Sequence, residues 1–484
     1  MPSVPTTYDL IVIGSGPAGR RAAVQGAKLG KRVLVVERGR RVGGVSVHTG
    51  TIPSKTLRET VLNLSGWRER GFYGRSYRVK QDIGAADLLK RLHMTLDHEV
   101  EILEHQFARN GVCVARGAAR FTGPHAIEIA ADDGTTSDCT AQRFVIAVGT
   151  RTYRPAHIAF DGEAILDSDE ILGLTRIPRQ LVVIGGGVIG MEYASIFSAL
   201  DARVTVLESS DTLLPFLDRE LVDEFVHDLR DRGVALRYGC KVKAAYRAKH
   251  CTIETEDGRA LTADMVLFAA GRVGATDGLA LEACGLVADA RGRIAFDPQT
   301  FQTAAPHIYA VGDVIGFPSL ASTSMEQGRI AACHAFDEPS HAPPEFFPYG
   351  IYAVPEISTV GMTEEEVRKR AIPYECGVAR FREISRGHIM GLSSGFLKMI
   401  FALETRRLLG VHIVGEGATE LIHIGQAVLN LKGTLDYFVE NTFNYPTLAE
   451  AYKVAALDAY NRLTRTQPSV RAAEQTLERI RRAV

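Results

Sequence analysis

The feature that most constrains the fold of this chain is a glycine-rich turn that occurs twice. The first copy reads LIVIGSGPAG and leads through an Ala-rich stretch to RVLVVE; the second reads LVVIGGGVIG and leads to RVTVLE. Both have the spacing G-x-G-x-x-G, and in both a glutamate stands 18 positions after the third glycine. The unbroken apolar runs predict buried parallel strands, with a helix between them. Each copy is therefore expected to be a βαβ unit that binds a dinucleotide.

The residue types of these turns suit that task. Glycines let the chain turn tightly and let backbone N–H groups approach a pyrophosphate at a helix N-terminus. The glutamate can accept a hydrogen bond from a ribose hydroxyl. The predicted residues are Gly14, Gly16, Gly19 and Glu37 in the first copy, and Gly185, Gly187, Gly190 and Glu208 in the second.

Length and composition limit the other possibilities. A chain of 484 residues is expected to form about three domains. Its net charge of −1 argues against nucleic acid or an anionic membrane as a partner, and no apolar run is long enough to span a membrane. The seven cysteines form no close pair, which indicates reduced, cytoplasmic thiols and predicts no metal site. The N-terminus lacks the pattern of a signal peptide.

Taken together, the two turns and three further segments in which a glycine follows an apolar strand (RFVIAVGT, MVLFAAG and IYAVGD) resemble the two-dinucleotide-binding-domain flavoproteins, the family of glutathione reductase and dihydrolipoamide dehydrogenase. The resemblance covers essentially the whole chain. Within that family, GTIPSKTLRE, YAVGDVIGFPSLA and FNYPTLAEAYKVAALD are similar to the soluble, FAD-containing pyridine nucleotide transhydrogenases.

The resemblance implies an α/β fold with two Rossmann-type domains, for FAD and NAD(P), and a C-terminal α+β dimerisation domain. The implied boundaries are 1–150 and 272–345 for the two parts of the FAD-binding and central region, 151–271 for the NAD(P)-binding domain and 346–484 for the dimerisation domain. Residues 337–350 are Pro-rich and are expected to be a linker. Residues 396–402 and 408–415 alternate like strands, and residues 471–484 have an amphipathic helical pattern.

The resemblance also implies two sets of cofactor-binding residues. For FAD, Glu37 marks the adenosine ribose, Gly149 and Thr150 lie near the adenosine end, Gly43, Gly44 and Ser46 lie along the isoalloxazine and ribityl chain, and Asp313 binds the ribitol. The whole FAD set is Gly14, Gly16, Gly19, Glu37, Arg38, Gly43, Gly44, Ser46, Lys55, Gly149, Thr150, Gly312, Asp313 and Ala321. The set for NAD(P)(H) is Gly185, Gly187, Gly190, Glu208 and Gly271.

The segment VGGVSVHTGTIPSK departs from the family's disulfide reductases in one respect. Its frame is theirs, but Ser46 and Thr51 stand where those enzymes have two redox-active cysteines. A hydroxyl cannot form a thiolate or a disulfide, so the route from flavin through a disulfide is closed. Lys55, after an expected Pro-Ser turn, is retained. The resemblance pairs it with Glu192 beside the flavin, where it would stabilise the charge that develops as hydride arrives.

A second departure agrees with the first. The disulfide reductases have a histidine before Pro-Thr, paired with a glutamate five residues on and supplied by the partner subunit; here Tyr445 and Glu450 hold these positions. A phenol is a poor base at neutral pH, so the group that manages thiol protons is lost along with the thiols. Sharing of these two residues between chains, together with the apolar faces of the C-terminal region, implies a homodimer or a higher homo-oligomer.

The resulting expectation is hydride transfer between NADPH and NAD⁺ in a ping-pong reaction through FAD, with no disulfide. One alternative is an NADH-dependent diaphorase or quinone reductase that passes electrons to a small acceptor. Another is a flavoprotein that serves as a scaffold or redox sensor without catalysis. Glu208 favours NAD(H) and opposes a 2′-phosphate, so acceptance of NADP(H) rests on the resemblance.

Overall fold

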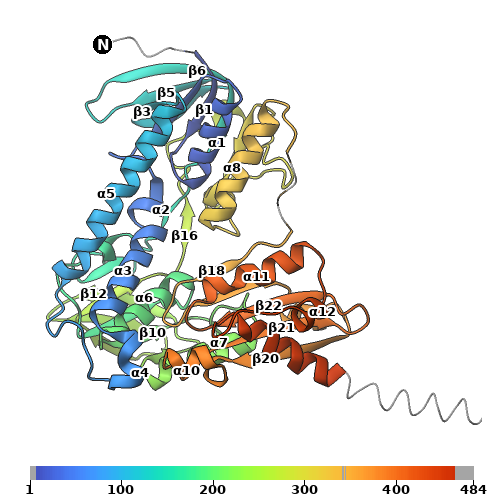
Figure 1. Ribbon diagram of the computed structural model, residues 1–484. Coiled ribbons are helices and arrows are strands. Elements are labelled where there is room, and N and C mark those ends of the chain that lie inside the picture. Colours follow the sequence, from blue (N-terminus) through green and yellow to red (C-terminus); the bar gives the residue numbers. More distant parts are fainter. Residues whose placement is uncertain (1–6, 341–342, 344, 464–484) are drawn as a thin grey trace, which may run out of the picture.

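The computed structural model describes residues 7–340, 343 and 345–463, and three main β-sheets organise them (Figure 1). The first sheet has the order β3-β2-β1-β6-β5-β4, with β17 paired to β6. Its strands are β1 (Thr7–Ile13), β2 (Val33–Glu37), β3 (Cys113–Arg116), β4 (Ala118–Gly123), β5 (Ala126–Ala130), β6 (Thr136–Ile146) and β17 (Ile308–Ala310). The pairs β3-β2, β2-β1, β1-β6 and β6-β17 are parallel, whereas β4, β5 and β6 are joined by antiparallel pairing.

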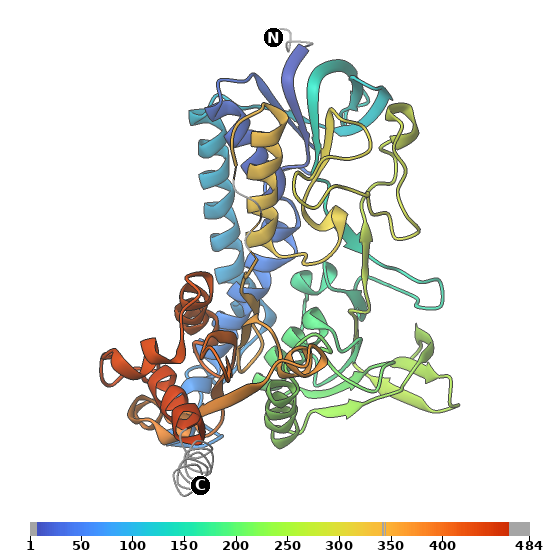
Figure 2. The same ribbon diagram turned by 90° about the vertical axis from the view of Figure 1, so that its right-hand side faces the viewer.

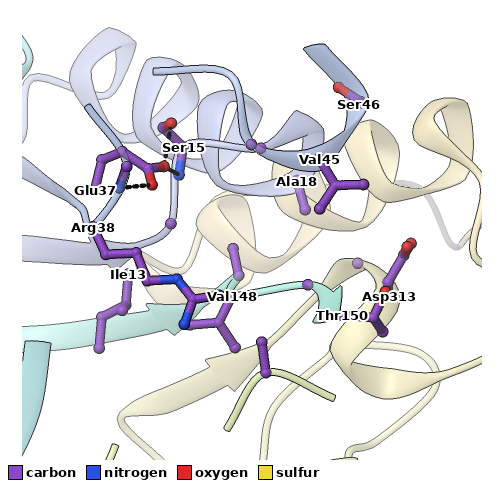
Figure 3. Close-up of a pocket in the computed structure, with 18 of the residues that line it drawn as sticks. Ile13, Ser15, Ala18, Glu37, Arg38, Val45, Ser46, Val148, Thr150 and Asp313 are labelled. Atoms are coloured by element: carbon purple, nitrogen blue, oxygen red, sulfur yellow. Dashed lines mark hydrogen bonds between the residues drawn. The ribbon is translucent and has the colours of Figure 1, made fainter. Parts of the chain in front are cut away.

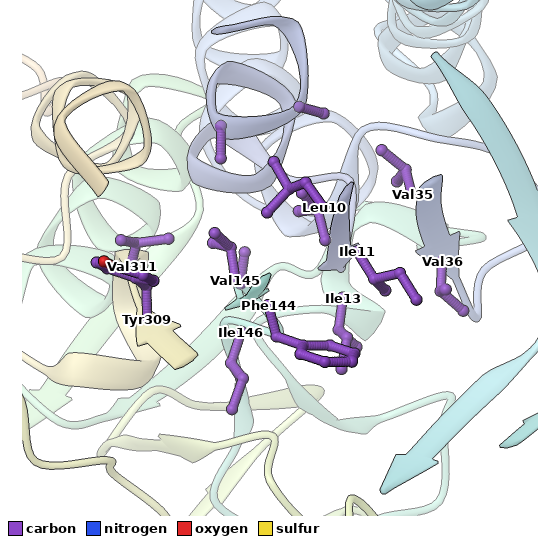
Figure 4. Close-up of a cluster of buried hydrophobic side chains, with 14 of the residues drawn as sticks. Leu10, Ile11, Ile13, Val35, Val36, Phe144, Val145, Ile146, Tyr309 and Val311 are labelled. Atoms are coloured by element: carbon purple, nitrogen blue, oxygen red, sulfur yellow. The ribbon is translucent and has the colours of Figure 1, made fainter. Parts of the chain in front are cut away.

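The centre of the first sheet is buried on both faces, as its apolar runs predicted. Leu10 and Ile11 of β1, Val35 of β2 and Phe144 of β6 are fully or almost fully buried, and Figure 4 shows them meeting in one cluster. Two helices, α1 (Pro17–Lys28) and α8 (Ala321–Ala335), lie side by side next to this sheet (Figures 1 and 2). They approach closely because Gly328 has no side chain, and a Cβ there would lie 2.1 Å from the carbonyl oxygen of Ala18.

The second sheet is entirely parallel and has the order β11-β10-β9-β15-β8. Its strands are β8 (Ile165–Asp167), β9 (Gln180–Ile184), β10 (Arg203–Leu207), β11 (Ala235–Arg237) and β15 (Met265–Phe268), and its helices are α6 (Val188–Ala199) and α7 (Arg219–Asp231). An antiparallel ribbon of β12 (Val242–Arg247), β13 (Cys251–Thr255) and β14 (Ala260–Ala263) extends from it. The chain enters and leaves this region through β7 (Thr150–Thr152) and β16 (Arg272–Gly274), which pair with each other.

The third sheet is antiparallel and has the order β18-β19-β22-β21-β20. Its strands are β18 (Tyr349–Ile351), β19 (Ile357–Gly361), β20 (Tyr374–Arg380), β21 (Phe396–Ala402) and β22 (Leu408–Val414). The helices of this region are α9 (Glu364–Lys369), α10 (Ser385–Ile389), α11 (Ala418–Asn430) and α12 (Leu435–Glu440), and residues 450–463 are also helical. The strands expected at 396–402 and 408–415 are confirmed as β21 and β22, but their side chains do not alternate between buried and exposed, because nearly all of them are buried.

Two helices of the N-terminal part connect the regions. Both α3 (Thr51–Leu64) and the long helix α5 (Ala85–Arg109) run from the first sheet towards the second (Figures 1 and 2). Leu57 and Val61 of α3 are buried in the same cluster as Met191 of α6 and Ile351 of β18. This shared core fixes α3 against α6, which carry Lys55 and Glu192.

Several expectations need correction or fall elsewhere. Residues 337–350 are not a linker throughout, because β18 begins at Tyr349 and pairs with β19. The helix expected over residues 471–484 lies outside the described residues. Within the described part, no helix is both long and apolar enough to cross a membrane. All seven cysteines are free, and four of them, Cys139, Cys251, Cys284 and Cys333, are buried.

Candidate functional site

The two glycine-rich turns have the same backbone geometry. The first glycine has a positive φ in each, +102° at Gly14 and +107° at Gly185, so the strand can turn directly into the helix. The third glycine packs on the first: a Cβ at Gly19 would lie 1.9 Å from the carbonyl oxygen of Gly14, and one at Gly190 would lie 2.0 Å from that of Gly185. These contacts hold strand and helix close together in both units.

The middle glycines, Gly16 and Gly187, leave open space. A Cβ at either position would meet no atom within 4 Å. Each is the N-cap of its helix, α1 or α6, and within the described residues neither helix has a side-chain cap. The first N–H groups of both helices are therefore free to bind an anion such as a pyrophosphate.

The two glutamates make matching hydrogen bonds. Glu37 accepts from the backbone N–H of Ser15 at 3.0 Å and of Gly39 at 2.8 Å. Glu208, which directly follows β10, accepts from the N–H of Gly186 at 2.6 Å and of Ser210 at 2.8 Å. Burial alone would raise the pKa of Glu208, but the hydrogen bonds from Ser210 and Gly186 hold that pKa below its usual value. Glu208 is therefore ionised at neutral pH.

A single cleft follows the first turn across the ends of the first sheet. Figure 3 shows Glu37 and Ser15 on one side of the cleft and Asp313 on the other, with Ser46 above. The N-terminus of α8, at Ala321, also opens into it and has no side-chain cap within the described chain. The sequence-predicted residues that line the cleft are Gly14, Gly16, Glu37, Arg38, Gly44, Ser46, Gly149, Thr150, Gly312, Asp313 and Ala321. Gly19, Gly43 and Lys55 lie just outside this lining.

Thr150 differs from its expected place. It was expected with Gly149 near the end of the cleft that Glu37 marks, but it lies beside Asp313 (Figure 3). The reason is that β7 begins at Thr150, and Arg272 of the paired strand β16 donates from Nε to the Thr150 hydroxyl at 2.9 Å. Burial raises the pKa of Asp313, and the charge of Arg272 and a hydrogen bond from Thr150 oppose that rise.

Lys55 and Glu192 form the expected ion pair. The ammonium nitrogen lies 2.9 Å from both carboxylate oxygens of Glu192, whose side chain is only 5% exposed. Glu192 also accepts a hydrogen bond from the backbone N–H of Tyr352 at 2.9 Å, and the Tyr352 ring lies 4.9 Å from the Lys55 nitrogen. The pair is therefore held by three regions of the chain at once.

The sequence predicted a Pro-Ser turn before Lys55, but the structure has a helix there. Pro53 and Ser54 belong to the first turn of α3, where proline is tolerated because no N–H is needed there. The helix places Lys55 towards α6. One turn on, Arg58 is 2% exposed, and its Nε donates to the carbonyl oxygen of Ala353 at 2.9 Å.

Ser46 and Thr51 both line the cleft. Ser46 lies in the short helix α2 (Gly44–His48), and Thr51 is the first residue of α3. The free cysteines all lie elsewhere in the sequence, between Cys113 and Cys376. The cleft is thus lined by hydroxyls at the two positions where the sequence resemblance to the disulfide reductases leads to an expectation of thiols.

Tyr445 and Glu450 do not line the cleft of their own chain. Tyr445 is 64% exposed, and its hydroxyl lies 2.7 Å from that of Ser385. One carboxylate oxygen of Glu450 is buried without a hydrogen-bond partner in the described part of the chain. In the second unit, Gly271 has a φ of +122° just before β16.

Three residues of these sites were missed by reading the sequence. The Ser15 hydroxyl donates to Glu37 and accepts from the N–H of Gly43 at 2.8 Å, joining the first turn to the segment that leads to Lys55. Its place between two motif glycines was a usable signal. Arg272 directly follows Gly271 and could have been suspected on that ground. Nothing local marked Tyr352, because its role comes from packing between distant segments.

Two dinucleotide-binding units meet at a partly buried ion pair, and a third sheet packs against them. This arrangement defines a class of oxidoreductases with two dinucleotide sites. The model of the pyridine nucleotide-disulphide oxidoreductase family matches residues 8–328, and the model of that family's dimerisation domain matches residues 347–456. The chain belongs to the pyridine nucleotide-disulphide oxidoreductase family.

Relatives within the family are similar over most of their length. A soluble pyridine nucleotide transhydrogenase of Mycobacterium bovis BCG is 52% identical over 460 residues, covering 94% of this chain and 98% of the relative. One from Klebsiella pneumoniae is 44% identical over 461 residues, with the same coverage. Among solved structures, the HOCl-induced flavoprotein disulfide reductase RclA of Escherichia coli has a TM-score of 0.84 at 26% identity, covering 93% of this chain and 99% of its own. LpdA of Mycobacterium tuberculosis has a TM-score of 0.86 at 26% identity.

Proposed function

We propose that this protein is an FAD-dependent enzyme that transfers hydride between NADPH and NAD⁺, giving NADP⁺ and NADH. The observation that carries this function is the meeting of two dinucleotide sites at the Lys55–Glu192 pair, with hydroxyls in place of thiols at Ser46 and Thr51. The names of the relatives with 52% and 44% identity support the same activity.

The first cleft fits FAD. Two helix N-termini, those of α1 and α8, open into it. The N-terminus of α1 suits the pyrophosphate, and that of α8 suits an oxygen of the flavin ring that carries partial negative charge. Glu37 stands at one side for a ribose, and Asp313 stands at the other for a polyol hydroxyl (Figure 3). When bound, FAD supplies two-electron hydride chemistry, which the side chains of this cleft cannot perform.

The residues of the chain then hold and tune the reacting groups. Lys55 keeps a positive charge at the junction of the two sites, where it stabilises negative charge that develops on a neighbouring ring. Glu192 and the ring of Tyr352 hold the ammonium in place. The second turn, with Gly187 open at the N-terminus of α6, binds the nicotinamide nucleotide and directs it towards Glu192.

Because Ser46 and Thr51 carry no thiol, electrons that enter from one nicotinamide nucleotide have no disulfide by which to leave. They leave to a second nicotinamide nucleotide that takes the same place. Tyr445 occupies the position at which the resemblance places the reductases' histidine. Without thiols, a histidine that manages thiol protons is not needed there. We infer that one pocket serves both nucleotides in turn.

Glu208 makes NAD(H) the tighter ligand of that pocket. Its ionised carboxylate stands at the end of β10, where it would repel a 2′-phosphate. Its three hydrogen bonds, from Gly186, Ser210 and the Ser209 hydroxyl, leave it turned towards its own loop. We therefore expect NADP(H) to bind more weakly than NAD(H) and still to react.

An anaerobic two-step experiment tests this function. The purified flavoprotein is reduced with NADPH, the excess nucleotide is removed, and reoxidation is timed separately with NAD⁺ and with a quinone. Rapid reoxidation by NAD⁺ with formation of NADH is the expected result. Reoxidation by the quinone alone would identify a quinone reductase. In a parallel reduction with NADH, a flavin that neither NADPH nor NADH bleaches would identify a scaffold or sensor.

We further infer a homodimer, because the dimerisation-domain model matches residues 347–456 and Tyr445 and Glu450 do not reach the cleft of their own chain. We also propose the domain division 1–150 and 272–345, 151–271, and 346–484, which is supported by the three sheets. A cytoplasmic location is consistent with the seven free thiols.

A further inference from the structure

Three aromatic side chains from distant segments contact one another in a row beside the junction of the two sites. The ring of Tyr349 lies 4.9 Å, centroid to centroid, from Phe216 at an interplanar angle of 60°. Tyr349 also contacts Phe317: the two ring centroids are 6.5 Å apart, and the interplanar angle is 7°. We refer to Phe216, Tyr349 and Phe317 as the aromatic ladder.

The outer members of the aromatic ladder are unusually open to solvent. Phe317 is 70% exposed and Phe216 is 40% exposed. Large apolar side chains gathered at the surface commonly mark a binding groove, whereas a single exposed residue needs no explanation. The near-parallel pair of Phe317 and Tyr349, together with the exposed and tilted ring of Phe216, offers aromatic surface to a further ring, since aromatic rings prefer offset-stacked or edge-to-face contacts.

Each member of the aromatic ladder is tied to a different part of the sites. Phe317 follows the short helix η4 (Gly312–Ile315), which carries Asp313 of the first cleft. Phe216 lies on the loop that follows Glu208. Leu213 of the same loop packs against Gly186 of the second turn, and a Cβ on Gly186 would lie 2.2 Å from the Leu213 side chain.

Tyr349 completes the arrangement from the third sheet. It begins β18, the strand that leads directly to Tyr352, and Tyr352 contacts both Lys55 and Glu192. Burial raises the pKa of Tyr349 to about 12, and the charges of Glu192 and Asp313 add to that rise. Through β18 and Tyr352, the central ring of the ladder is joined to the Lys55–Glu192 pair, where the two sites meet.

We propose that the aromatic ladder is the contact surface for the nicotinamide ring of NAD(P)(H), and that it positions this ring before hydride transfer. This role rests on the function proposed above. The second unit holds the pyrophosphate at its glycine turn and the adenosine half at Glu208, so the other half of the dinucleotide extends along α6 to Glu192. The ring at the end of that half is planar and aromatic, and it arrives beside Tyr349.

The ladder is expected to act on both nucleotides alike. NADH and NADPH have the same nicotinamide ring and differ only in the 2′-phosphate at the adenosine end. Loss of a ladder ring should therefore weaken both by the same factor, whereas changes near Glu208 should affect the two nucleotides differently. ADP-ribose lacks the nicotinamide, so changes to the ladder should leave its dissociation constant unchanged.

Equilibrium binding to the FAD-loaded enzyme tests this role. Dissociation constants for NAD⁺, NADP⁺ and ADP-ribose are measured by calorimetry for the wild type, Phe317→Leu and Phe216→Leu. Loss of one ring contact should raise the constants of NAD⁺ and NADP⁺ in parallel by about three- to tenfold and leave that of ADP-ribose unchanged. Phe317→Tyr keeps the ring and should bind like the wild type.

Phe72→Leu is a matched control, because Phe72 is another exposed phenylalanine, 56% exposed, on the helix α4 (Arg70–Tyr73) away from the ladder. Unchanged constants for NAD⁺ in both ladder variants would overturn the role. Equal weakening of ADP-ribose would also overturn it, since that pattern indicates general damage to the second site. Failure of the wild type to bind NADP⁺ would instead refute the transhydrogenase function, and the ladder would then be judged from NAD⁺ and ADP-ribose.

Discussion

The turn that carries Gly14 and the turn that carries Gly185 share a backbone, but they are joined to the rest of the molecule in different ways. In the first turn, the residue after the leading glycine is Ser15, whose hydroxyl links Glu37 to the N–H of Gly43. In the second, Gly186 has no side chain, and Leu213 fills the space beside it. Glu37 is 8% exposed, whereas Ser209 and Ser210 beside Glu208 lie at the surface.

This difference fits two kinds of ligand. A site whose acid is tied to the segment leading to Lys55 can be formed once and kept, as a resident cofactor requires. A site whose loop faces solvent can fill and empty in each turnover, as an exchanged substrate requires. The same fingerprint thus serves both purposes, and the neighbouring residues decide which purpose each copy serves.

The largest effect is expected where the two units meet. Lys55→Met removes the positive charge at the junction, and the rate of flavin reduction by NADH should fall by about 10²–10³-fold. The FAD content should be unchanged, because Lys55 lies outside the lining of the cleft. Rapid mixing under anaerobic conditions measures this rate.

Lys31→Met is the control for that variant, because Lys31 lies 4.9 Å from the ring of Phe336, the same distance as Lys55 from Tyr352. It should reduce at the rate of the wild type. A fall of less than about threefold in Lys55→Met would show that its charge does not act on the transition state.

The next largest effect separates the two turns. Gly19→Ala and Gly190→Ala introduce the same collision, with carbonyl oxygens 1.9 and 2.0 Å away. Overpacking of this kind is costly, so each variant should lose its own ligand by at least about tenfold in affinity. Gly19→Ala should be purified with little flavin, and Gly190→Ala should retain flavin but bind NAD⁺ weakly. Flavin absorbance and NAD⁺ titration measure the two outcomes.

Gly123→Ala and Gly173→Ala are the matched controls, since a Cβ at either position meets nothing within 4 Å. Both should keep flavin and nucleotide affinity. If Gly190→Ala also lost its flavin, the two units would not be separable in the way that their surroundings suggest.

A smaller effect concerns the choice of nucleotide. Ser209 stands in the second unit where Arg38 stands in the first, directly after the glutamate. Ser209→Arg should bring a cation to a 2′-phosphate and tighten NADP⁺ binding by about three- to tenfold, with little change for NAD⁺. Glu208→Gln should act in the same direction by removing the repulsion. Equal changes for both nucleotides would contradict a role of this loop in selecting them.

The smallest effect is in stability and has opposite signs at the two sites. Burial raises the pKa of Asp313, so ionisation of this group lowers stability as the pH rises through its folded pKa. In flavin-free protein, Asp313→Asn should melt a few degrees higher than the wild type at pH 7, and the gap should shrink towards about pH 4.

Glu208 is the counterpart, because its folded pKa lies below the usual value. Its contribution is present at neutral pH and is lost as the pH falls through that folded pKa. Glu208→Gln should therefore melt slightly lower than the wild type at pH 7. Thermal scans of both variants at several pH values test these signs, and shifts of the same sign at both sites would be inconsistent with the surroundings of Asp313 and Glu208 described above.

The parts of the molecule that the sequence predicted are those with local rules. The glycine turns, the strands around them and the acids at the strand ends follow from spacing and apolar runs, and the structure contains them. The Lys55–Glu192 contact could be expected only through resemblance to a family, since 137 positions separate the two residues. Thr150 was misplaced because the pairing of β7 with β16, which fixes it, leaves no mark in the local sequence. The aromatic ladder was not foreseen for the same reason.

Tyr352 has a consequence for how the protein matures. Its N–H holds Glu192 across 160 positions, and Arg58, one turn after Lys55 on α3, is held by Ala353 across 295. During synthesis, therefore, both nucleotide-binding units can leave the ribosome while the lysine and the glutamate still lack their anchor. Contacts so distant in sequence form late, because a long loop must close first. The ability to bind cofactor should thus arise before the ability to catalyse the reaction. Catalysis by residues of the first two thirds of the chain then depends on the folding of the last third.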